Sequence, residues 1–137
     1  MKVIFGRNNL PFSWLIRVFT WSRWSHCGVI VGGDVIEATA TKGVVITPLA
    51  EFVARYRDHH VAHHAVIDTD FSAHGRALAE VGKKYDFLAI VGILFRAGWS
   101  NERRWFCSEL VAHAAGTYRK ERVSRITPET IWSCTND

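Results

Sequence analysis

The chain has 137 residues, enough to bury an independent core, and we expect a single domain over residues 1–137. With 48% hydrophobic and 22% charged residues, the composition is that of a folded protein and excludes a disordered chain. The net charge of +4 suits an anionic partner. The basic residues are dispersed along the chain, so we do not predict a nucleic-acid partner.

The first 24 residues predict a short strand over Met1–Phe5 and a helix over Pro11–Trp24, with Pro11 in its first turn. Ser13, Arg17 and Thr20 form a narrow polar stripe on this helix, and almost every other position is apolar or aromatic. No signal-peptide core precedes it, and no apolar run reaches the about 20 residues that cross a bilayer. We therefore expect a cytoplasmic protein, with delivery elsewhere by another route left open.

Three short strands with turn residues between them predict an antiparallel meander. The strands are Cys27–Val31, Val35–Thr39 and Val44–Thr47, with turns at Gly32-Gly33-Asp34 and Lys42-Gly43.

The rest of the chain alternates between helical and strand patterns, and a sheet with helices grouped around it indicates an α+β fold. The expected elements are a helix over Pro48–Arg57, a strand over His59–Asp68, a helix from Asp70 or Ser72 to Lys83, an apolar helix over Asp86–Phe95, a loop at Gly98–Asn101, a helix over Cys107–Tyr118, and a turn with a short closing helix from Thr127.

One of the three cysteines stands where a nucleophile would be activated. Cys107 follows the apolar pair Trp105-Phe106 and begins a predicted helix, whose N-terminal backbone N–H groups and positive dipole favour a thiolate. Cys27, Cys107 and Cys134 form no even disulfide framework, so we expect reduced thiols.

A base and a group to orient it come from the first hairpin of the meander. The turn pairs residues whose numbers sum to about 66, which places Glu37 diagonally from His26, within reach of a long side chain. Glu37 in an apolar strand is costly unless it is paired, which favours a functional role, although a nearby arginine could supply a purely structural pair. The alternation of the strand puts Cys27 on the opposite, core face, so we interpret Cys27 as a packing residue.

In their order and spacing, these motifs resemble the circularly permuted branch of the NlpC/P60 papain-like family, the YiiX-like proteins. The matching segments are Leu15-Ile16, Ser25-His26-x-Gly28, Gly43-Val44, Pro48-Leu49, Gly82-x-x-Tyr85-Asp86-Phe87, Phe106-Cys107-Ser108-Glu109-Leu110-Val111 and Ile126-Thr127-Pro128.

The resemblance implies a papain-like fold with a small antiparallel sheet packed against helices. It also implies that Cys107 is the nucleophile, His26 its base, Glu37 the group that orients His26, and Tyr85 a neighbour of the oxyanion hole. The implied activity is a cysteine peptidase or amidase that forms a thioacyl intermediate. We interpret Glu109 as support for the helix N-terminus.

Several alternatives remain at this level. The substrate is a peptide, a peptidoglycan fragment (as for a phage lysis protein) or an acylated, lipid-like conjugate. The protein could instead be an acyltransferase like those of the LRAT type, or a non-catalytic module that binds lipid or an anionic surface. The helix carrying Trp14, Trp21 and Trp24 either lies on a membrane or packs across the sheet.

Four histidines in one segment, His59, His60, His63 and His64, have metal-ligand spacing only if the segment is helical. Its pattern favours a strand, which splits them between two faces. We expect no metal and no cofactor.

Overall fold

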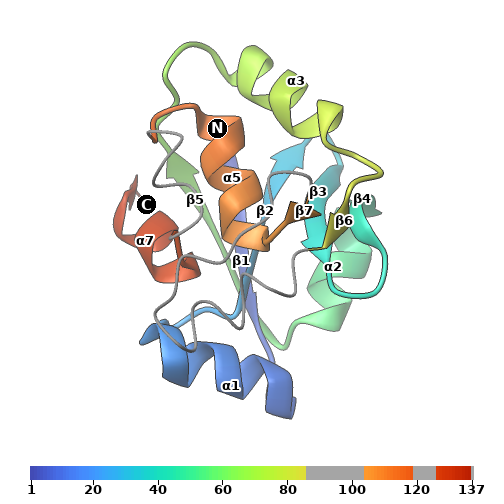
Figure 1. Ribbon diagram of the computed structural model, residues 1–137, viewed down its shortest axis with the longest axis vertical. Helices are drawn as coiled ribbons and strands as arrows, with labels where there is room; N and C mark the ends of the chain where they lie inside the picture. The colour runs from blue at the N-terminus through green and yellow to red at the C-terminus, as the bar shows by residue number, and fades with distance from the viewer. Residues whose placement is uncertain (86–103, 119–125, 137) are drawn as a thin grey trace.

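A six-stranded antiparallel sheet in the order β4-β3-β2-β1-β5-β8 forms the centre of the computed structural model (Figure 1), which describes residues 1–85, 104–118 and 126–136. The strands are β1 Lys2–Arg7, β2 His26–Val31, β3 Asp34–Thr39, β4 Gly43–Pro48, β5 Asp58–His64 and β8 Thr135–Asn136. A separate parallel pair consists of β6 Lys84–Tyr85 and β7 Arg104–Trp105.

The predicted meander is confirmed and its register is close to the expected one. Val29 pairs with Ile36 and Val31 with Asp34, so paired residues sum to 65 and a two-residue Gly32-Gly33 turn joins β2 to β3. Gly32 has a φ of 61°, a left-handed conformation that glycine adopts at little cost. Since a tight turn fixes the register, it also fixes which side chains of β2 and β3 are neighbours.

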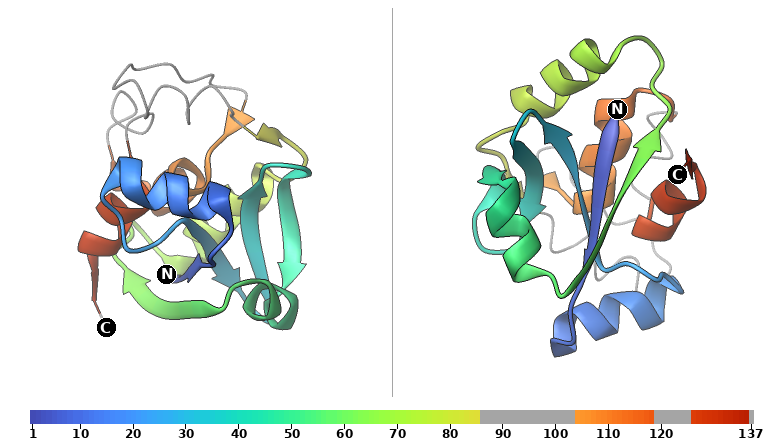
Figure 2. Two further views of the ribbon diagram at one scale, coloured as in Figure 1. Left: turned by 90° about the horizontal axis from the view of Figure 1, so that it is seen from below. Right: turned by 180° about the vertical axis from the view of Figure 1, so that it is seen from behind.

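Helices cover both faces of the sheet. The described helices are α1 Pro11–Thr20, α2 Leu49–Arg55, α3 Asp70–Ala79, α5 Cys107–Ala115 and α7 Pro128–Ser133. The larger core lies under α3 and α5 and includes Phe5, Cys27 and Leu110. Seen from behind, α2 covers the opposite face, where a smaller core includes Phe52 and Tyr56 (Figure 2).

Two predicted helices extend beyond the ends that the structure shows, and the N-cap of a third is a different residue. The first helix ends at Thr20 rather than Trp24, because Trp21 adopts a left-handed backbone with a φ of 52°. The helix at Cys107 ends at Ala115, where Gly116 provides the left-handed C-cap. The cap of α3 is neither Asp70 nor Ser72 but Thr69, whose Oγ1 accepts a hydrogen bond from the Ser72 backbone N–H at 3.2 Å.

The face that α1 turns to solvent differs from that of an ordinary surface helix. The polar Ser13 and the apolar Ile16 are buried, whereas Trp14 and Trp21 are exposed. Trp24 lies outside the helix and is only 6% exposed, because it packs against Phe5 and Trp132. Of the two alternatives for the tryptophans, Trp24 packs in the core, whereas Trp14 and Trp21 are exposed, so the three do not share one surface.

The apolar helix predicted over Asp86–Phe95 and the loop at Gly98–Asn101 lie outside the described residues. Within the described ranges, no helix combines the length and the apolar character needed to cross a membrane.

Candidate active site

Cys107 is the first residue of α5, as predicted, and its side chain lies in the core between this helix and the sheet. The preceding residue, Phe106, has an extended backbone and connects β7 to α5 as the N-cap of the helix. Its N–H donates a 3.2 Å hydrogen bond to Oε2 of Glu109 in the first turn. This contact confirms that Glu109 supports the N-terminus of the helix, where a negative charge is favoured.

His26 begins β2 and contacts Glu37 on β3 as the hairpin register predicts. The His26 Nε2 and Glu37 Oε2 atoms are 2.6 Å apart. The imidazole stacks on the ring of Tyr56 with a centroid distance of 5.3 Å, and on that of Phe52 at 5.8 Å. The carboxylate and the two rings of α2 and its C-cap therefore hold the imidazole in one orientation, and Cys107 is among the groups that raise the pKa of His26.

Glu37 is buried and bound from three sides. Its Oε1 accepts hydrogen bonds from Thr47 Oγ1 at 2.7 Å and from Arg55 Nη2 at 2.6 Å, and Arg55 Nη1 lies 3.3 Å from Oε2. Burial opposes the charged carboxylate, but the hydrogen bonds from His26, Arg55 and Thr47 outweigh it and lower the pKa of Glu37 to about 2. Glu37 is therefore ionised throughout the physiological range.

The pKa values of Cys107 and His26 shift in opposite directions. Burial raises the pKa of Cys107, but hydrogen bonds with Cys27 and His26 and the charge of His26 lower it to about 5. Burial lowers the pKa of His26, whereas the interactions with Tyr56, Cys107 and Glu37 raise it well above 6.5. Both shifts favour the charged forms, a thiolate on Cys107 and an imidazolium on His26.

Arg55 extends this pair into a chain of four charges. The order Cys107, His26, Glu37, Arg55 alternates negative and positive, and Arg55, whose side chain is 37% exposed, provides a countercharge for the buried carboxylate. The sequence reading allowed that an arginine might pair with Glu37 but did not identify it. The carboxylate contacts both groups, so the structural pair and the orienting contact exist together.

Cys27 has a second contact that the sequence prediction missed. It is buried in the core opposite the His26–Glu37 face, as predicted. An interaction with Cys27 is also among the causes that lower the pKa of Cys107. The available signal was the alternation of β2, which points Cys27 toward the side of the sheet where α5 packs.

Tyr85 lies on β6, next to the strand that leads into Cys107. Residues Lys84 and Tyr85 pair in parallel with Arg104 and Trp105. The Tyr85 side chain is buried, with its ring 6.0 Å from that of Phe106. Burial, followed by the charge of Cys107, raises the pKa of Tyr85 well above 10, so the phenol keeps its proton.

The histidine-rich segment is a strand, as predicted. On β5, His64 Nε2 is 2.9 Å from the Tyr118 hydroxyl, whereas His59 and His63 are exposed. Over residues 1–85, 104–118 and 126–136, no group of three His, Cys, Asp or Glu side chains is placed to hold a metal ion. The described donor atoms therefore do not fit a metal site.

Comparison with known proteins supports the same architecture. A family model described as permuted papain-like amidase enzyme, YaeF/YiiX, C92 family, matches residues 2–128. The crystal structure of metalloprotein yiiX from Escherichia coli O157:H7 has a TM-score of 0.64 and 26% identity, over 82% of this chain and 62% of that one. The chain thus spans less than two thirds of that protein. No curated protein matches it.

Proposed function

The chain belongs to the permuted papain-like amidase family of the YaeF/YiiX type, and we propose that it is a cysteine amidase with Cys107 as nucleophile, His26 as acid and base, and Glu37 as the residue that orients His26. The observation that carries this proposal is the chain of contacts from Cys107 through His26 to Glu37, with the pKa of Cys107 at about 5. A thiolate at neutral pH can attack a carbonyl carbon without prior loss of a proton.

In the proposed first half-reaction, the Cys107 thiolate attacks the amide carbonyl carbon and the C=O electron pair moves onto oxygen. The Cys107 backbone N–H at the start of α5, with Tyr85 beside it, stabilises this oxyanion. The His26 imidazolium donates its proton to the leaving nitrogen, the C–N bond breaks, and a thioester remains on Cys107. The protonated Tyr85 is suited to donate a hydrogen bond.

In the second half-reaction, neutral His26 accepts a proton from water as the water oxygen attacks the thioester. The C–S bond then breaks, the acid product leaves, and the thiolate and imidazolium are restored. The similar crystal structure is described as that of a metalloprotein. The described donor atoms of this chain do not fit a metal, so no step here passes through one.

For the substrate, we propose an amide whose carbonyl group belongs to a peptide or to a fatty acyl chain. Peptidoglycan peptides and acylated, lipid-like conjugates both contain this bond. An alcohol or amine in place of water would make the same thioester the intermediate of an acyltransferase. Analysis of products distinguishes the two reactions, because hydrolysis yields a free acid and transfer yields a new ester or amide.

The test uses p-nitrophenyl octanoate as a probe, with intact-protein and peptide mass spectrometry. We expect a burst of p-nitrophenolate and an octanoyl adduct on the Cys107 peptide. The Cys107→Ala variant should show neither, whereas the matched control Cys134→Ala, at an exposed thiol, should show both. An undiminished burst in Cys107→Ala would refute the assignment. Muropeptides and N-acyl amino acids, assayed in parallel, then report which amide is cleaved.

A further inference from the structure

The helix α1 exposes apolar residues and buries a polar one, the reverse of an ordinary surface helix. Its exposed side, the α1 apolar face, consists of Leu10, Phe12, Trp14, Val18, Phe19 and Trp21, of which Trp21 is 88% and Trp14 is 57% exposed. Surface helices of globular proteins normally direct such residues toward the core and direct polar residues outward. Several large apolar side chains exposed together on one helix are typical of an interaction site.

The polar stripe of the same helix faces the protein and fixes its orientation. Ser13 Oγ donates a 2.6 Å hydrogen bond to Ser25 Oγ and accepts one from the Asn8 backbone N–H at 3.3 Å. Ser25 in turn bonds to Gly6 through its backbone N–H at 3.2 Å. These buried polar contacts would be lost if α1 rotated to hide its apolar face, so the exposure belongs to the folded state.

The segment that carries the α1 apolar face is basic, although Glu129 approaches it and accepts a hydrogen bond on Oε2 from the Arg23 backbone N–H at 3.1 Å. Residues 1–33 contain Lys2, Arg7, Arg17 and Arg23 and no acidic residue. Arg7 lies just before α1, Arg17 within it and Arg23 just after it. Such a combination of apolar, aromatic and basic residues is typical of helices that lie at the interface of an anionic bilayer.

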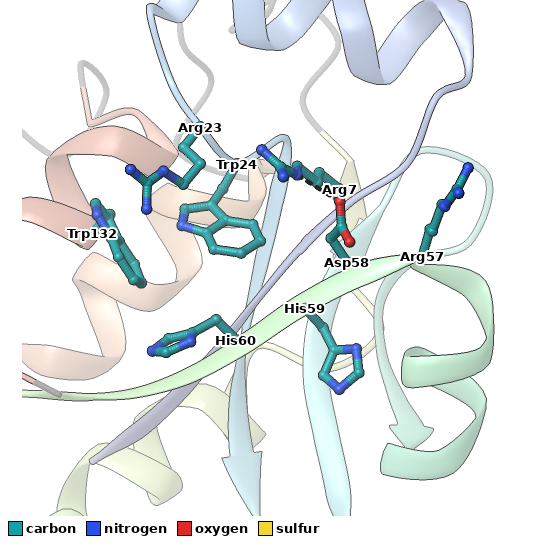
Figure 3. Close-up of a pocket in the computed structure, with 8 residues that line it drawn as sticks. All are labelled: Arg7, Arg23, Trp24, Arg57, Asp58, His59, His60 and Trp132. Atoms are coloured by element: carbon teal, nitrogen blue, oxygen red, sulfur yellow. Dashed lines mark hydrogen bonds and ion pairs between the residues drawn. The ribbon is translucent and has the colours of Figure 1, made fainter.

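A cavity of about 500 Å³ next to α1 adds donors for anionic oxygens (Figure 3). It is lined by Arg7, Arg23, Arg57, Asp58, His59, His60 and two tryptophans, Trp24 and Trp132. Asp58 is its acidic residue and is already paired with Arg7 at 3.0 Å. Buried donor atoms of Arg17 (Nε) and Trp24 (Nε1) have no hydrogen-bond partner among the described residues.

We propose that α1 is a membrane-docking helix, with the α1 apolar face in the boundary between headgroups and acyl chains of an anionic bilayer and with Arg7 and Arg23 on the lipid phosphates. A lipid surface fits better than a second copy of the chain, because a second α1 would bring like charges together at the same contact. Since Ser13 of α1 bonds to Ser25, the neighbour of His26, docking would hold the proposed active site beside the lipid.

The test is co-sedimentation of the full chain with vesicles of phosphatidylcholine alone, or mixed equally with phosphatidylglycerol, at low and high salt. We expect binding to the anionic vesicles to be at least about tenfold tighter and to weaken as salt rises. A Trp14→Ser, Trp21→Asn double variant should bind at least about tenfold less, because two interfacial anchors are removed. Asparagine tolerates the left-handed backbone at position 21.

Phe71→Ser is the matched control, since Phe71 is an aromatic residue that is 87% exposed on α3 rather than α1. It should bind vesicles like the wild type. All three altered positions are exposed, and circular dichroism verifies that each variant is folded. Absence of binding to anionic vesicles, or equal binding by the double variant, would overturn the proposal. So would concentration-dependent dimerisation that the double variant abolishes, which would identify a second copy as the occupant. The octanoyl-adduct assay does not depend on vesicles, so its result is separate.

Discussion

The proposed catalytic pair makes a quantitative prediction about the titration of Cys107. Its pKa of about 5 lies below the value of about 8.5 for a free thiol, a difference worth about 5 kcal/mol. His26 contributes both a hydrogen bond and a positive charge to this shift, and Cys27 contributes a further hydrogen bond. Removal of the imidazole in His26→Ala or His26→Gln should therefore raise the pKa of Cys107 by about two units or more.

The magnitude decides which quantity to measure. A rise of two units lowers the thiolate fraction at pH 6 about tenfold. The more basic thiolate is, however, about eightfold more nucleophilic. The two effects nearly cancel, so the alkylation rate measured at a single pH would hardly differ between the wild type and the variant. The assay must locate the inflection of the iodoacetamide alkylation rate against pH, with the Cys107 peptide resolved from the other two by mass spectrometry.

We expect the wild type to show its inflection near pH 5 and both His26 variants to show it at higher pH. His63→Ala, which removes an exposed histidine of β5, should leave the inflection unchanged. If both His26 variants keep the wild-type inflection, the thiolate does not depend on the imidazole. The assignment of His26 as the partner of Cys107 would then be wrong.

Three other predictions concern Cys27, Glu37 and Thr69. Cys27→Ala should raise the alkylation inflection of Cys107 and lower the free energy of unfolding by about 1 kcal/mol, whereas Cys27→Ser keeps a donor and should shift the inflection less. Because the pKa of Glu37 is about 2 in the fold against 4.5 when unfolded, its carboxylate stabilises the fold above pH 4.5 and loses this effect as the pH falls toward 2. Urea unfolding should show a loss of about 3 kcal/mol over that range, absent in Glu37→Gln; an unchanged pH dependence in Glu37→Gln would contradict the pairing with Arg55 and His26. Thr69→Ala should cost about 1 kcal/mol in the same assay because it removes the cap of α3, and no loss would mean that the cap is not formed.

Local sequence patterns are sufficient to predict most strands and helix starts and one contact of the site. Alternation, glycine turns and the position of Cys107 after an apolar pair identify strands and a helix start, because these signals depend on neighbouring residues. The two-residue turn at Gly32-Gly33 fixes the hairpin register, and the register places His26 diagonally from Glu37. Most of the proposed site was predictable for this reason, whereas helix ends depended on single left-handed residues such as Trp21.

The groups that complete the site from distant parts of the chain, and the direction in which α1 faces, follow from long-range packing and not from local patterns. Arg55 reaches Glu37 from α2 and Cys27 reaches Cys107 across the core, at separations in the chain that no local pattern constrains. The pattern of α1 shows a wide apolar and a narrow polar face but does not say which faces inward. The folded structure shows it: Ser13 and Ile16 face the protein, with Ser13 hydrogen-bonded to Ser25, whereas Trp14 and Trp21 face outward.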